Sequence, residues 1–278
     1  MALRLKEKTM KKIILIVTAL FLGLFAKAQQ DALYTQYMLN TLAVNPAYAG
    51  SRNVLSATAL SRTQWVGIEG APRTQTLTFD AAMPNKKVGL GLQVFNDVLG
   101  ITKTTGAYLS YAYRIKTGRG TLALGVQGGV ANFRADFSSV ELNTGSPIDP
   151  SFSSNINKLL PNYGFGVYYN TEKFYLGVAT PHLLNNRLTD ENSVMVTNGL
   201  VAKQYLHLFV TSGVVIDMGQ DFKLKPSFLF KGVMGAPLQL DVNANLWIKD
   251  RVSIGAQYRT QDAFAGLFEI QVSDQLRV

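Results

Sequence analysis

The main pattern in this chain is an alternation of apolar and polar residues, which continues from Pro46 almost to the end. In residues 238–248, every second residue is apolar and most residues between them are polar. This period of two predicts β-strands, because successive side chains of a strand point to opposite faces of its sheet. We therefore predict an all-β fold with strands at 53–63, 74–83, 88–96, 104–115, 120–133, 161–170, 174–184, 204–217, 222–234, 238–248, 252–260 and 263–272.

The length of these segments favours a membrane barrel over a secreted sandwich, whose strands would also alternate. Strands of about 9 to 11 residues match a tilted crossing of a bilayer, whereas ordinary strands have about five or six residues. Aromatic residues near segment ends are typical of the interfacial girdles of outer-membrane barrels. The chain has such residues at Tyr111, Tyr113, Tyr163, Tyr169 and Tyr258. On the period alone, the secreted sandwich remains the alternative.

The predicted connections alternate between long and short ones. The long connections are 64–73, 97–103, 134–160 and 185–203, and all of them are odd-numbered. The even-numbered connections are short, such as 84–87, 116–119, 171–173 and 249–251. Long outer loops and short periplasmic turns are typical of outer-membrane barrels. The parity therefore predicts a transmembrane antiparallel up-and-down β-barrel with a periplasmic amino terminus.

Twelve strands are recognisable, and residues 275–278 resemble the start of a thirteenth. Lipid offers no water to unpaired backbone groups, so strands cross a bilayer only in a closed sheet. Bacterial single-chain barrels have even strand numbers, so we expect about 14 strands in the full-length protein and a final hairpin that this sequence lacks. A barrel of 12 strands with a short tail is the alternative.

The first 28 residues have the composition of a secretory signal peptide. Lys11 and Lys12 precede an uncharged apolar run, and Ala-Lys-Ala follows that run. A spanning helix needs about 20 apolar residues, more than this run contains, so cleavage before Gln29 is expected and a retained anchor helix is the alternative. The predicted organisation is a signal peptide at 1–28 with an extension at 1–9, a plug-like segment at 29–52 and an outer-membrane barrel at 53–278.

Charge and cysteine content exclude several classes of partner and site. Residues 1–28 hold six of the 27 Lys and Arg and one of the 18 Asp and Glu, which leaves 21 basic and 17 acidic residues, a net charge of +4. No basic run remains, so a nucleic-acid partner is not expected. The chain has no cysteine, which excludes a lipoprotein anchor, a disulfide framework and thiolate metal sites.

The sequence predicts no enzyme, cofactor or metal site. Its two histidines, His182 and His207, are not part of a zinc or nucleophile motif. Gly89 and Gly91 belong to a predicted strand and not to the strand-to-helix turn that binds a dinucleotide. A barrel hydrolase would require a Ser and a His brought together by the fold, and it remains a third class of function.

Charged residues share the predicted inner face of the last strands: Lys223, Lys225, Lys231, Asp241 and Arg259. The three lysines and Arg259 either line a passage that mildly favours anions, or they pair with Asp241 and Glu269 and fill the lumen. We favour pairing, because opposite charges across neighbouring strands stabilise each other and small barrels are often filled.

Two long stretches carry a resemblance to a known family. Residues 30–51, QDALYTQYMLNTLAVNPAYAGS, and residues 62–84, RTQWVGIEGAPRTQTLTFDAAMP, resemble conserved blocks of the PorP/SprF family of Bacteroidetes outer-membrane proteins. The likeness continues through VGLGLQVFNDVLG and through 225–259. The matching motif residues are Asn45, Pro46, Ala47, Tyr48, Gly50, Arg62, Gln64, Trp65, Gly67, Gly70, Ala71, Pro72 and Thr74.

The resemblance implies a component of the type IX secretion system in the outer membrane. Its implied partners are outer-membrane lipid, the signal domain of a secreted adhesin and other type IX secretion components, with a role in gliding motility in some relatives. It also implies a FadL-like barrel, so a channel for small hydrophobic ligands is the alternative function. Trp65 is then either an interfacial anchor or part of a surface that meets a partner.

Overall fold

The computed structural model of this chain describes residues 36–139, 155–188, 203–234, 236–260 and 262–278. The predicted signal peptide and residues 29–35 lie outside these ranges, as do parts of the two longest predicted loops. The helices of the described residues are three short 3-10 turns, η1 (Thr41–Ala43), η2 (Pro46–Tyr48) and η3 (Phe137–Ser139). Within the described ranges, no helix has both the length and the apolar character needed to cross a membrane.

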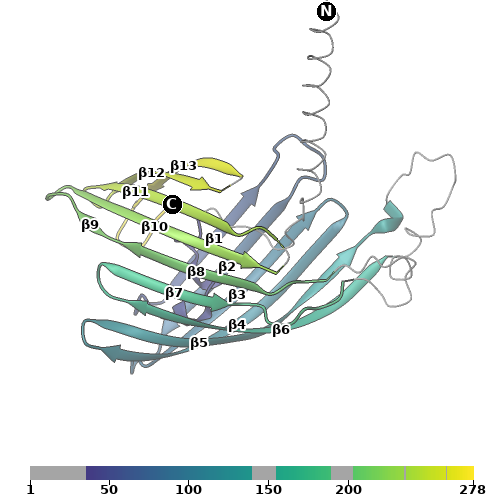
Figure 1. The fold of residues 1–278 in the computed structure, drawn as a ribbon, viewed down its shortest axis with the longest axis horizontal. Helices are drawn as coiled ribbons and strands as arrows, with labels where there is room; N and C mark the ends of the chain where they lie inside the picture. The colour runs from purple at the N-terminus through teal and green to yellow at the C-terminus, as the bar shows by residue number, and fades with distance from the viewer. Residues whose placement is uncertain (1–35, 140–154, 189–202, 235, 261) are drawn as a thin grey trace, which may run out of the picture.

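The strands form one antiparallel sheet in which long strands that are consecutive in the chain are also neighbours, and a short strand, β9, pairs beside this path with β10 (Figure 1). This arrangement confirms the predicted all-β, up-and-down fold. The strands of the described residues are β1 (Ser56–Thr63), β2 (Arg73–Ala82), β3 (Val88–Leu99), β4 (Thr102–Thr117), β5 (Gly120–Ala135), β6 (Ile156–Asn170), β7 (Phe174–Thr180), β8 (His207–Val214), β9 (Ile216–Asp217), β10 (Phe222–Val233), β11 (Gln239–Ile248), β12 (Val252–Arg259) and β13 (Ala263–Ile270).

The connections fall alternately at two ends of the sheet, because consecutive strands run in opposite directions. We call one end the loop end; it carries connections 64–72, 136–155 and 181–206. The other is the turn end, where connections such as 118–119 and 171–173 are short. In Figure 1 the hairpin turns of β4–β5 and β6–β7 mark the turn end, on the left.

One predicted long loop is wrong. Most of residues 97–103 belong to strands, since β3 continues to Leu99 and β4 begins at Thr102. Gly100 allows the resulting tight turn because its φ is +55°, a region that glycine adopts without a steric penalty. The Gly100 N–H also donates a hydrogen bond of 2.8 Å to the carbonyl oxygen of Gly70. Cross-strand pairing therefore continues to Leu99 and resumes at Thr102, within the stretch predicted as a loop.

Two strands are shorter than the pattern predicted. β7 ends at Thr180 instead of residue 184, and β8 covers only 207–214 of the predicted 204–217. Pro181 follows β7 directly, and proline has no N–H to donate to a ladder of strands. The regular ladder therefore ends at Thr180, and beyond Pro181 the Leu183 N–H still donates a hydrogen bond of 2.9 Å to the Tyr163 carbonyl oxygen on β6.

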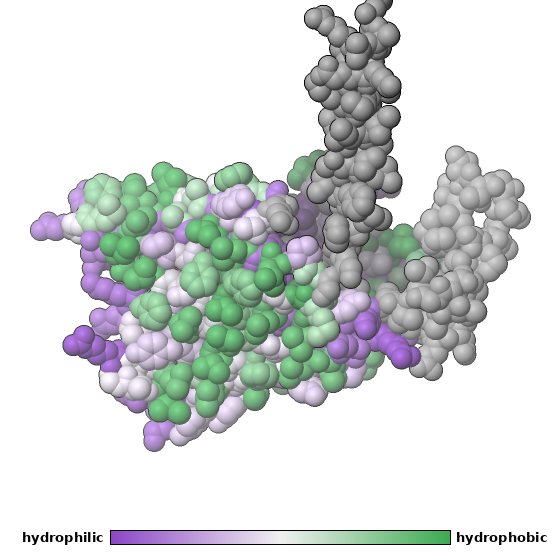
Figure 2. Space-filling model, in the orientation of Figure 1, coloured by the Kyte–Doolittle hydropathy of each residue, from purple (hydrophilic) through white to green (hydrophobic). Residues whose placement is uncertain are grey.

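Burial alternates along the strands as the predicted inner and outer faces require. In β2, Thr74, Thr76, Thr78 and Asp80 are buried, and the alternate residues Gln75, Leu77 and Phe79 are exposed. Hydrophobic side chains cover the middle of the outer surface, and hydrophilic ones gather at the turn end (Figure 2). An apolar outer face around a polar interior is the pattern of a membrane barrel.

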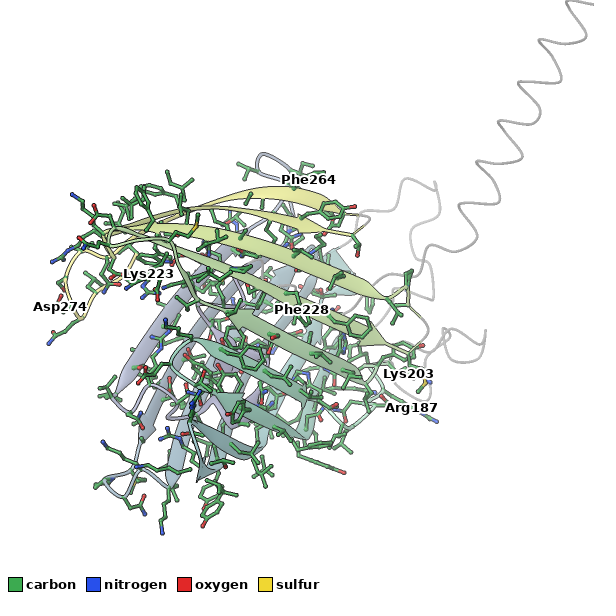
Figure 3. All side chains as sticks on the ribbon, turned by 60° about the vertical axis from the view of Figure 1, so that its left-hand side comes forward. Arg187, Lys203, Lys223, Phe228, Phe264 and Asp274 are labelled. Atoms are coloured by element: carbon green, nitrogen blue, oxygen red, sulfur yellow. The ribbon has the colours of Figure 1, made fainter. Side chains whose placement is uncertain are left out.

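Charged side chains lie at the two ends of the sheet. Lys223 and Asp274 lie at the turn end, and Arg187 and Lys203 lie at the loop end (Figure 3). Phe228 lies between these ends on the outer face. This separation matches the water, lipid and water layers that a membrane-spanning sheet crosses.

β1 and β13 stand at the two ends of the strand order, and in the described residues they do not pair with each other. Residues 275–278, predicted as the start of another strand, turn back along the end of β13. Val278 exchanges two backbone hydrogen bonds with Ile270, of 2.7 and 2.9 Å, and Gln271 forms a bridge with Arg277. The total of about 14 strands stays a prediction.

Val126→Arg tests the lipid-facing side of the sheet. Val126 points outward from the middle of the bilayer-crossing part of β5, and 56% of it is exposed. An arginine at the bilayer midplane costs about 2 to 4 kcal/mol. We expect this loss of unfolding free energy in urea titrations of protein folded into lipid vesicles. Thr117→Arg, at the turn end of β4, is the control and should cost less than about 1 kcal/mol; equal costs would contradict the assignment.

Candidate functional site

The chain between residues 36 and 52 lies inside the curled sheet. At its start, the Tyr37 hydroxyl is 3.2 Å from Ser227 Oγ on β10, and burial raises the pKa of this tyrosine. Next, Thr78 on β2 donates a hydrogen bond of 3.0 Å to Asn40 Oδ1. The segment then turns through η1, which lies against β2 and β3, and through η2, which lies against β4, β5 and β6. It therefore crosses the lumen from one wall to another, and we call residues 36–52 the lumen segment.

Asn45 and Pro46 start the helical turn η2 at the wall of the lumen. The Asn45 side chain accepts a hydrogen bond from Ala47 N at 2.9 Å, which caps the turn. Its Nδ2 donates a second hydrogen bond of 3.0 Å to the Val167 carbonyl oxygen on β6. Proline suits the first position of such a turn because its fixed φ matches and its missing N–H is not needed there. One amide side chain thus shapes the turn and attaches it to the wall.

Three inward glycines of the wall form a seat for this turn; we call Gly89, Gly125 and Gly166 the glycine seat. A Cβ on Gly89 would lie 1.9 Å from the Ala49 oxygen, and one on Gly125 would lie 2.2 Å from the Ala47 nitrogen. A Cβ on Gly166 would lie 2.1 Å from Asn45 Oδ1. No real Cβ approaches another atom so closely, so only glycine lets the lumen segment lie this close to the strands.

The last residues of the lumen segment are held by side chains of the wall. Gly50 has a φ of +72°, and its N–H donates a hydrogen bond of 2.9 Å to Asp80 Oδ2 on β2. The ring of Tyr48 packs edge-on against that of Tyr168 on β6, with 5.4 Å between centroids. Arg52 Nε donates to the Tyr48 hydroxyl at 3.0 Å. The first motif, Asn45 to Gly50, thus has a structural role inside the lumen.

The second motif lies elsewhere, at the loop end, and the fold does not bring the two motifs together. Gln64 N donates to the Pro72 oxygen at 3.0 Å and closes the loop between β1 and β2. Gly67 and Gly70 have positive φ values of +94° and +72°. Thr74 points inward, and its hydroxyl donates a hydrogen bond of 2.5 Å to Asp97 Oδ1. Arg62, Ala71 and the remaining motif positions are the half-buried flanks of this loop.

Trp65 is the unusual residue of this loop. Its φ is +46°, a conformation that costs a residue other than glycine roughly 1 to 2 kcal/mol. The side chain is nevertheless 62% exposed, beside Val66 and Ile68, which are also exposed. A large ring is therefore held in a strained backbone conformation without being buried.

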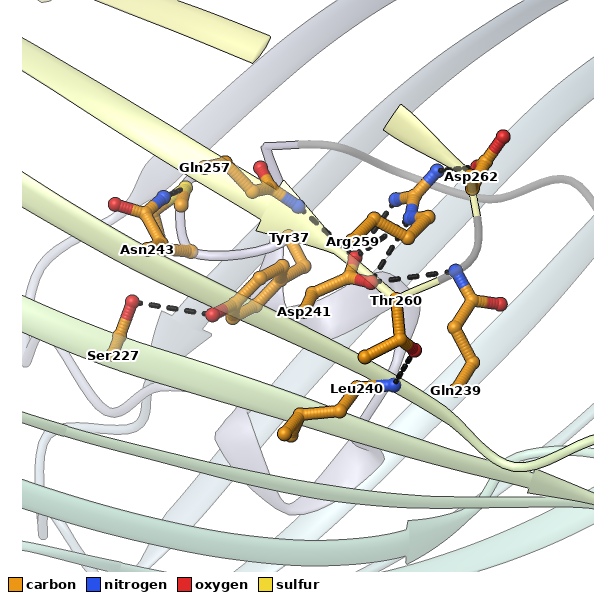
Figure 4. Close-up of polar contacts among 11 residues, drawn as sticks. Tyr37, Ser227, Gln239, Leu240, Asp241, Asn243, Gln257, Arg259, Thr260 and Asp262 are labelled. Carbon is orange, nitrogen blue, oxygen red and sulfur yellow. Dashed lines mark hydrogen bonds and ion pairs between the residues drawn. The ribbon is translucent and has the colours of Figure 1, made fainter. Parts of the chain in front are cut away.

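Arg259 and Asp241 form a buried ion pair on the inner faces of β11 and β12 (Figure 4). Arg259 donates from Nη2 and Nε to Asp241 Oδ2 at 2.8 and 3.1 Å, and from Nε to Oδ1 at 2.9 Å. Gln257 and Gln239 donate to the same carboxylate at 3.0 and 3.3 Å. Lys231, also buried, lies 5.9 Å from the Phe209 ring. This is the geometry of a filled lumen. A closed lumen that does not conduct stays a prediction.

The other predicted lumen charges lie at the turn end. Lys223 Nζ is paired with Asp250 on the exposed rim. Lys225 Nζ lies 4.5 Å above the Trp247 ring. The five charges therefore divide into a buried group near the loop end and two lysines near the turn end, and do not form a single row.

The lumen segment separates two cavities. The loop-end cavity, about 140 Å³, is lined mostly by apolar and aromatic side chains, among them Val44, Phe95, Tyr108, Phe133 and Phe209. The turn-end cavity, about 300 Å³, is more polar and is lined by Tyr48, Arg52, Tyr168, Lys225 and Trp247 among others.

The two histidines are not close to each other. His182 packs against Tyr108 with 5.2 Å between ring centroids. His207 is buried, and its Nδ1 lies 2.9 Å from the Tyr205 oxygen. Within the described ranges, no three His, Cys, Asp or Glu side chains are grouped as a metal site requires. The expected lack of an enzyme function stays a prediction.

A family model covers the part of the chain that holds both motifs. The model for the type IX secretion system membrane protein PorP/SprF matches residues 26–278, which include the lumen segment and the loop at 64–72. This chain belongs to the PorP/SprF family. It is therefore a membrane component of the type IX secretion system. No curated protein and no solved structure matches the chain, so the FadL-like relationship stays a prediction.

The sequence pattern by itself assigns no role to the individual motif residues of this PorP/SprF protein and does not predict the glycine seat. The sequence pattern places Gly89 only within a strand. Glycine weakens a strand interior, so its repeated occurrence at inward positions signals the close approach of another backbone. That signal was present at Gly125 and Gly166 as well.

Proposed function

We propose that this protein is a non-enzymatic outer-membrane barrel that assists the export or surface attachment of a secreted protein, such as a large adhesin. Membership of the PorP/SprF family supports a place in type IX secretion. The lumen segment and the Arg259–Asp241 network occupy the interior, which favours a docking or tethering role over passage of a polypeptide through the lumen.

The observation that carries the proposal is the exposed apolar tip at the loop end, formed by Trp65, Val66 and Ile68. Strained backbone conformations are concentrated at functional sites, and exposed tryptophans are common energetic anchors of interfaces. We infer that this tip contacts the secreted protein or another component of the secretion machinery. An interfacial anchor would instead need only one ring at the level of the lipid headgroups.

Replacing Trp65, Val66 and Ile68 together with serine tests this role. We expect surface display of the adhesin to fall about tenfold, because the loss of an anchoring tryptophan costs 2 kcal/mol or more of binding. Display is measured by antibody labelling of whole cells, and the amount of barrel by blotting of outer membranes.

The matched control is Val54→Ser with Leu55→Ser, which removes exposed apolar side chains at the opposite, turn end. Display should be unchanged in this variant. Loss of the barrel from the membrane in the triple variant would indicate a lipid anchor and contradict the partner role. Normal display in a strain without the gene would overturn the proposed function as a whole.

A channel for small hydrophobic ligands is the second candidate, and the loop-end cavity favours it. Its volume of about 140 Å³ is close to that of an engineered apolar cavity that binds benzene. It therefore suits a ring-sized ligand and not a long acyl chain. Saturable binding of small aromatic molecules by purified protein, together with normal adhesin display after gene deletion, would favour the channel.

A further inference from the structure

The turn-end cavity is a basic chamber closed on one side by the lumen segment. Met38, Tyr48 and Arg52 of that segment form one wall. The others come from the β6–β7 turn, from β8, β10, β11 and β13, and from Arg277. Lys173 in the turn has an exposed side chain, so the cavity opens at the turn end.

Cations outnumber carboxylates in the lining of this cavity. The cations are Arg52, Lys173, Lys225 and Arg277, and the carboxylates are Glu172 and Glu269. Lys173 is paired with Asp217 at 2.6 Å, and Arg277 lies 3.8 Å from Glu269. Within the described residues, neither Arg52 nor Lys225 has a carboxylate at ion-pair distance. The carboxylates that act on these two cations, Asp80 on Arg52 and Asp250 and Glu269 on Lys225, lie beyond ion-pair distance.

Trp247 holds two of these cations near each other. Lys225 Nζ and the Arg277 guanidinium lie 4.5 and 4.7 Å from the centre of its ring. Like charges in a partly enclosed space repel each other; Glu269 offsets part of this repulsion, and a bound anion would reduce it further. Arg52 donates to the Tyr48 hydroxyl through Nε, and its remaining donors suit a carboxylate.

The size of the cavity favours an extended ligand over a single ion. One water needs about 10 to 15 Å³ of such space, whereas this cavity offers about 300 Å³. The tyrosine rings of Tyr48, Tyr168 and Tyr175 continue from one to the next along the wall, with centroids 5.4 and 6.0 Å apart. They provide apolar surface for the stems of side chains whose charged ends meet the cations.

We propose that the turn-end cavity binds an acidic peptide segment, whose carboxylates are held by Arg52, Lys225 and Arg277. The segment enters from the side of the short turns, which is the periplasmic side of an outer-membrane barrel. This site lies at the opposite end from the apolar tip at Trp65. It does not depend on the proposed role in adhesin display, and its test uses purified protein alone.

The protein carries its own reporter for this site, because Trp65 and Trp247 are its two tryptophans. In a Trp65→Phe background, Trp247 is the single fluorescent indole, and it lines the cavity. A blocked tetraglutamate peptide is titrated into the folded protein in detergent, and a tetraglutamine peptide is titrated in parallel. We expect a saturable change of Trp247 emission with the glutamate peptide alone, and weaker binding at higher salt.

Lys225→Met and Arg52→Met should each weaken binding about tenfold, since each removes a charged hydrogen-bond partner. Lys223→Met is the matched control, because Lys223 lies on the same face of β10 but is paired with Asp250 and does not line the cavity. It should bind within about twofold of the parent. Arg52 does not contact the Trp247 ring, so that variant leaves the reporter unaltered.

Three results would overturn the proposal. The first is an equal response to the glutamate and glutamine peptides, and the second is an equal loss in Lys223→Met and Lys225→Met. The third is an equal affinity for free glutarate or inorganic phosphate, which would assign the cavity to small anions. Heat-modifiable migration on gels identifies any variant that has not folded. If Lys225→Met or Arg52→Met fails to fold, the peptide affinity of the other variant tests the proposal.

Discussion

Gly125→Ala is expected to destabilise the protein by about 3 kcal/mol, the upper part of the range for overpacking a rigid site. The added Cβ would lie 2.2 Å from the nitrogen and 2.3 Å from the Cα of Ala47. Both are backbone atoms of a turn that Asn45 attaches to β6, so no flexible side chain can move aside. The measurement is the urea midpoint of unfolding in lipid vesicles.

The control for this substitution is Gly128→Ala on the same strand. Gly128 faces outward, and a Cβ there would meet no atom within 4 Å. Its replacement should leave the midpoint within the experimental error. If Gly125→Ala were equally harmless, the lumen segment would not be seated on β5 as described.

Arg259→Met is expected to cost about 3 to 5 kcal/mol, as does removal of one partner from other buried ion pairs. The substitution leaves the Asp241 carboxylate buried, with only the two glutamine donors. Unfolding in urea measures the cost directly.

Two variants show whether this cost comes from the uncompensated charge. Arg259→Met with Asp241→Asn should recover much of the loss, because the remaining group is neutral and the burial of an unpaired charge is avoided. Lys223→Met breaks a pair on the exposed rim and should cost less than about 1 kcal/mol. If Lys223→Met and Arg259→Met lowered the unfolding free energy equally, burial would not explain the cost of losing Arg259.

The presence of the strands, and which of their side chains point inward or outward, could be predicted from the sequence because alternation is a local property. The two-residue period alone predicts that Leu77 and Phe79 point outward and that Thr76 and Thr78 point inward. Strand ends could not be predicted equally well. β3 continues to Leu99 and β4 begins at Thr102 because the two strands offer each other hydrogen bonds, which local sequence does not reveal.

The candidate site was only partly predictable. The likeness to a family identified Asn45, Gly50 and Trp65 as members of motifs, but it assigned them no contacts. Their roles differ because Asn45 meets β6 inside the lumen, whereas Trp65 is exposed on a loop at the loop end. The pairing of Arg259 with Asp241 was foreseeable as one of two arrangements, since both residues share a face on neighbouring strands.

By itself, the sequence determined the all-β class, the inner and outer faces and the family, because periodicity and motif order depend on neighbours along the chain. The tertiary structure alone decided that the lumen segment lies on the glycine seat, that it separates two cavities, and that Lys225, Arg52 and Arg277 line one of them. These residues are far apart in the chain. Only the curling of the sheet, driven by its right-handed twist and by the need to pair backbone groups in lipid, brings them together.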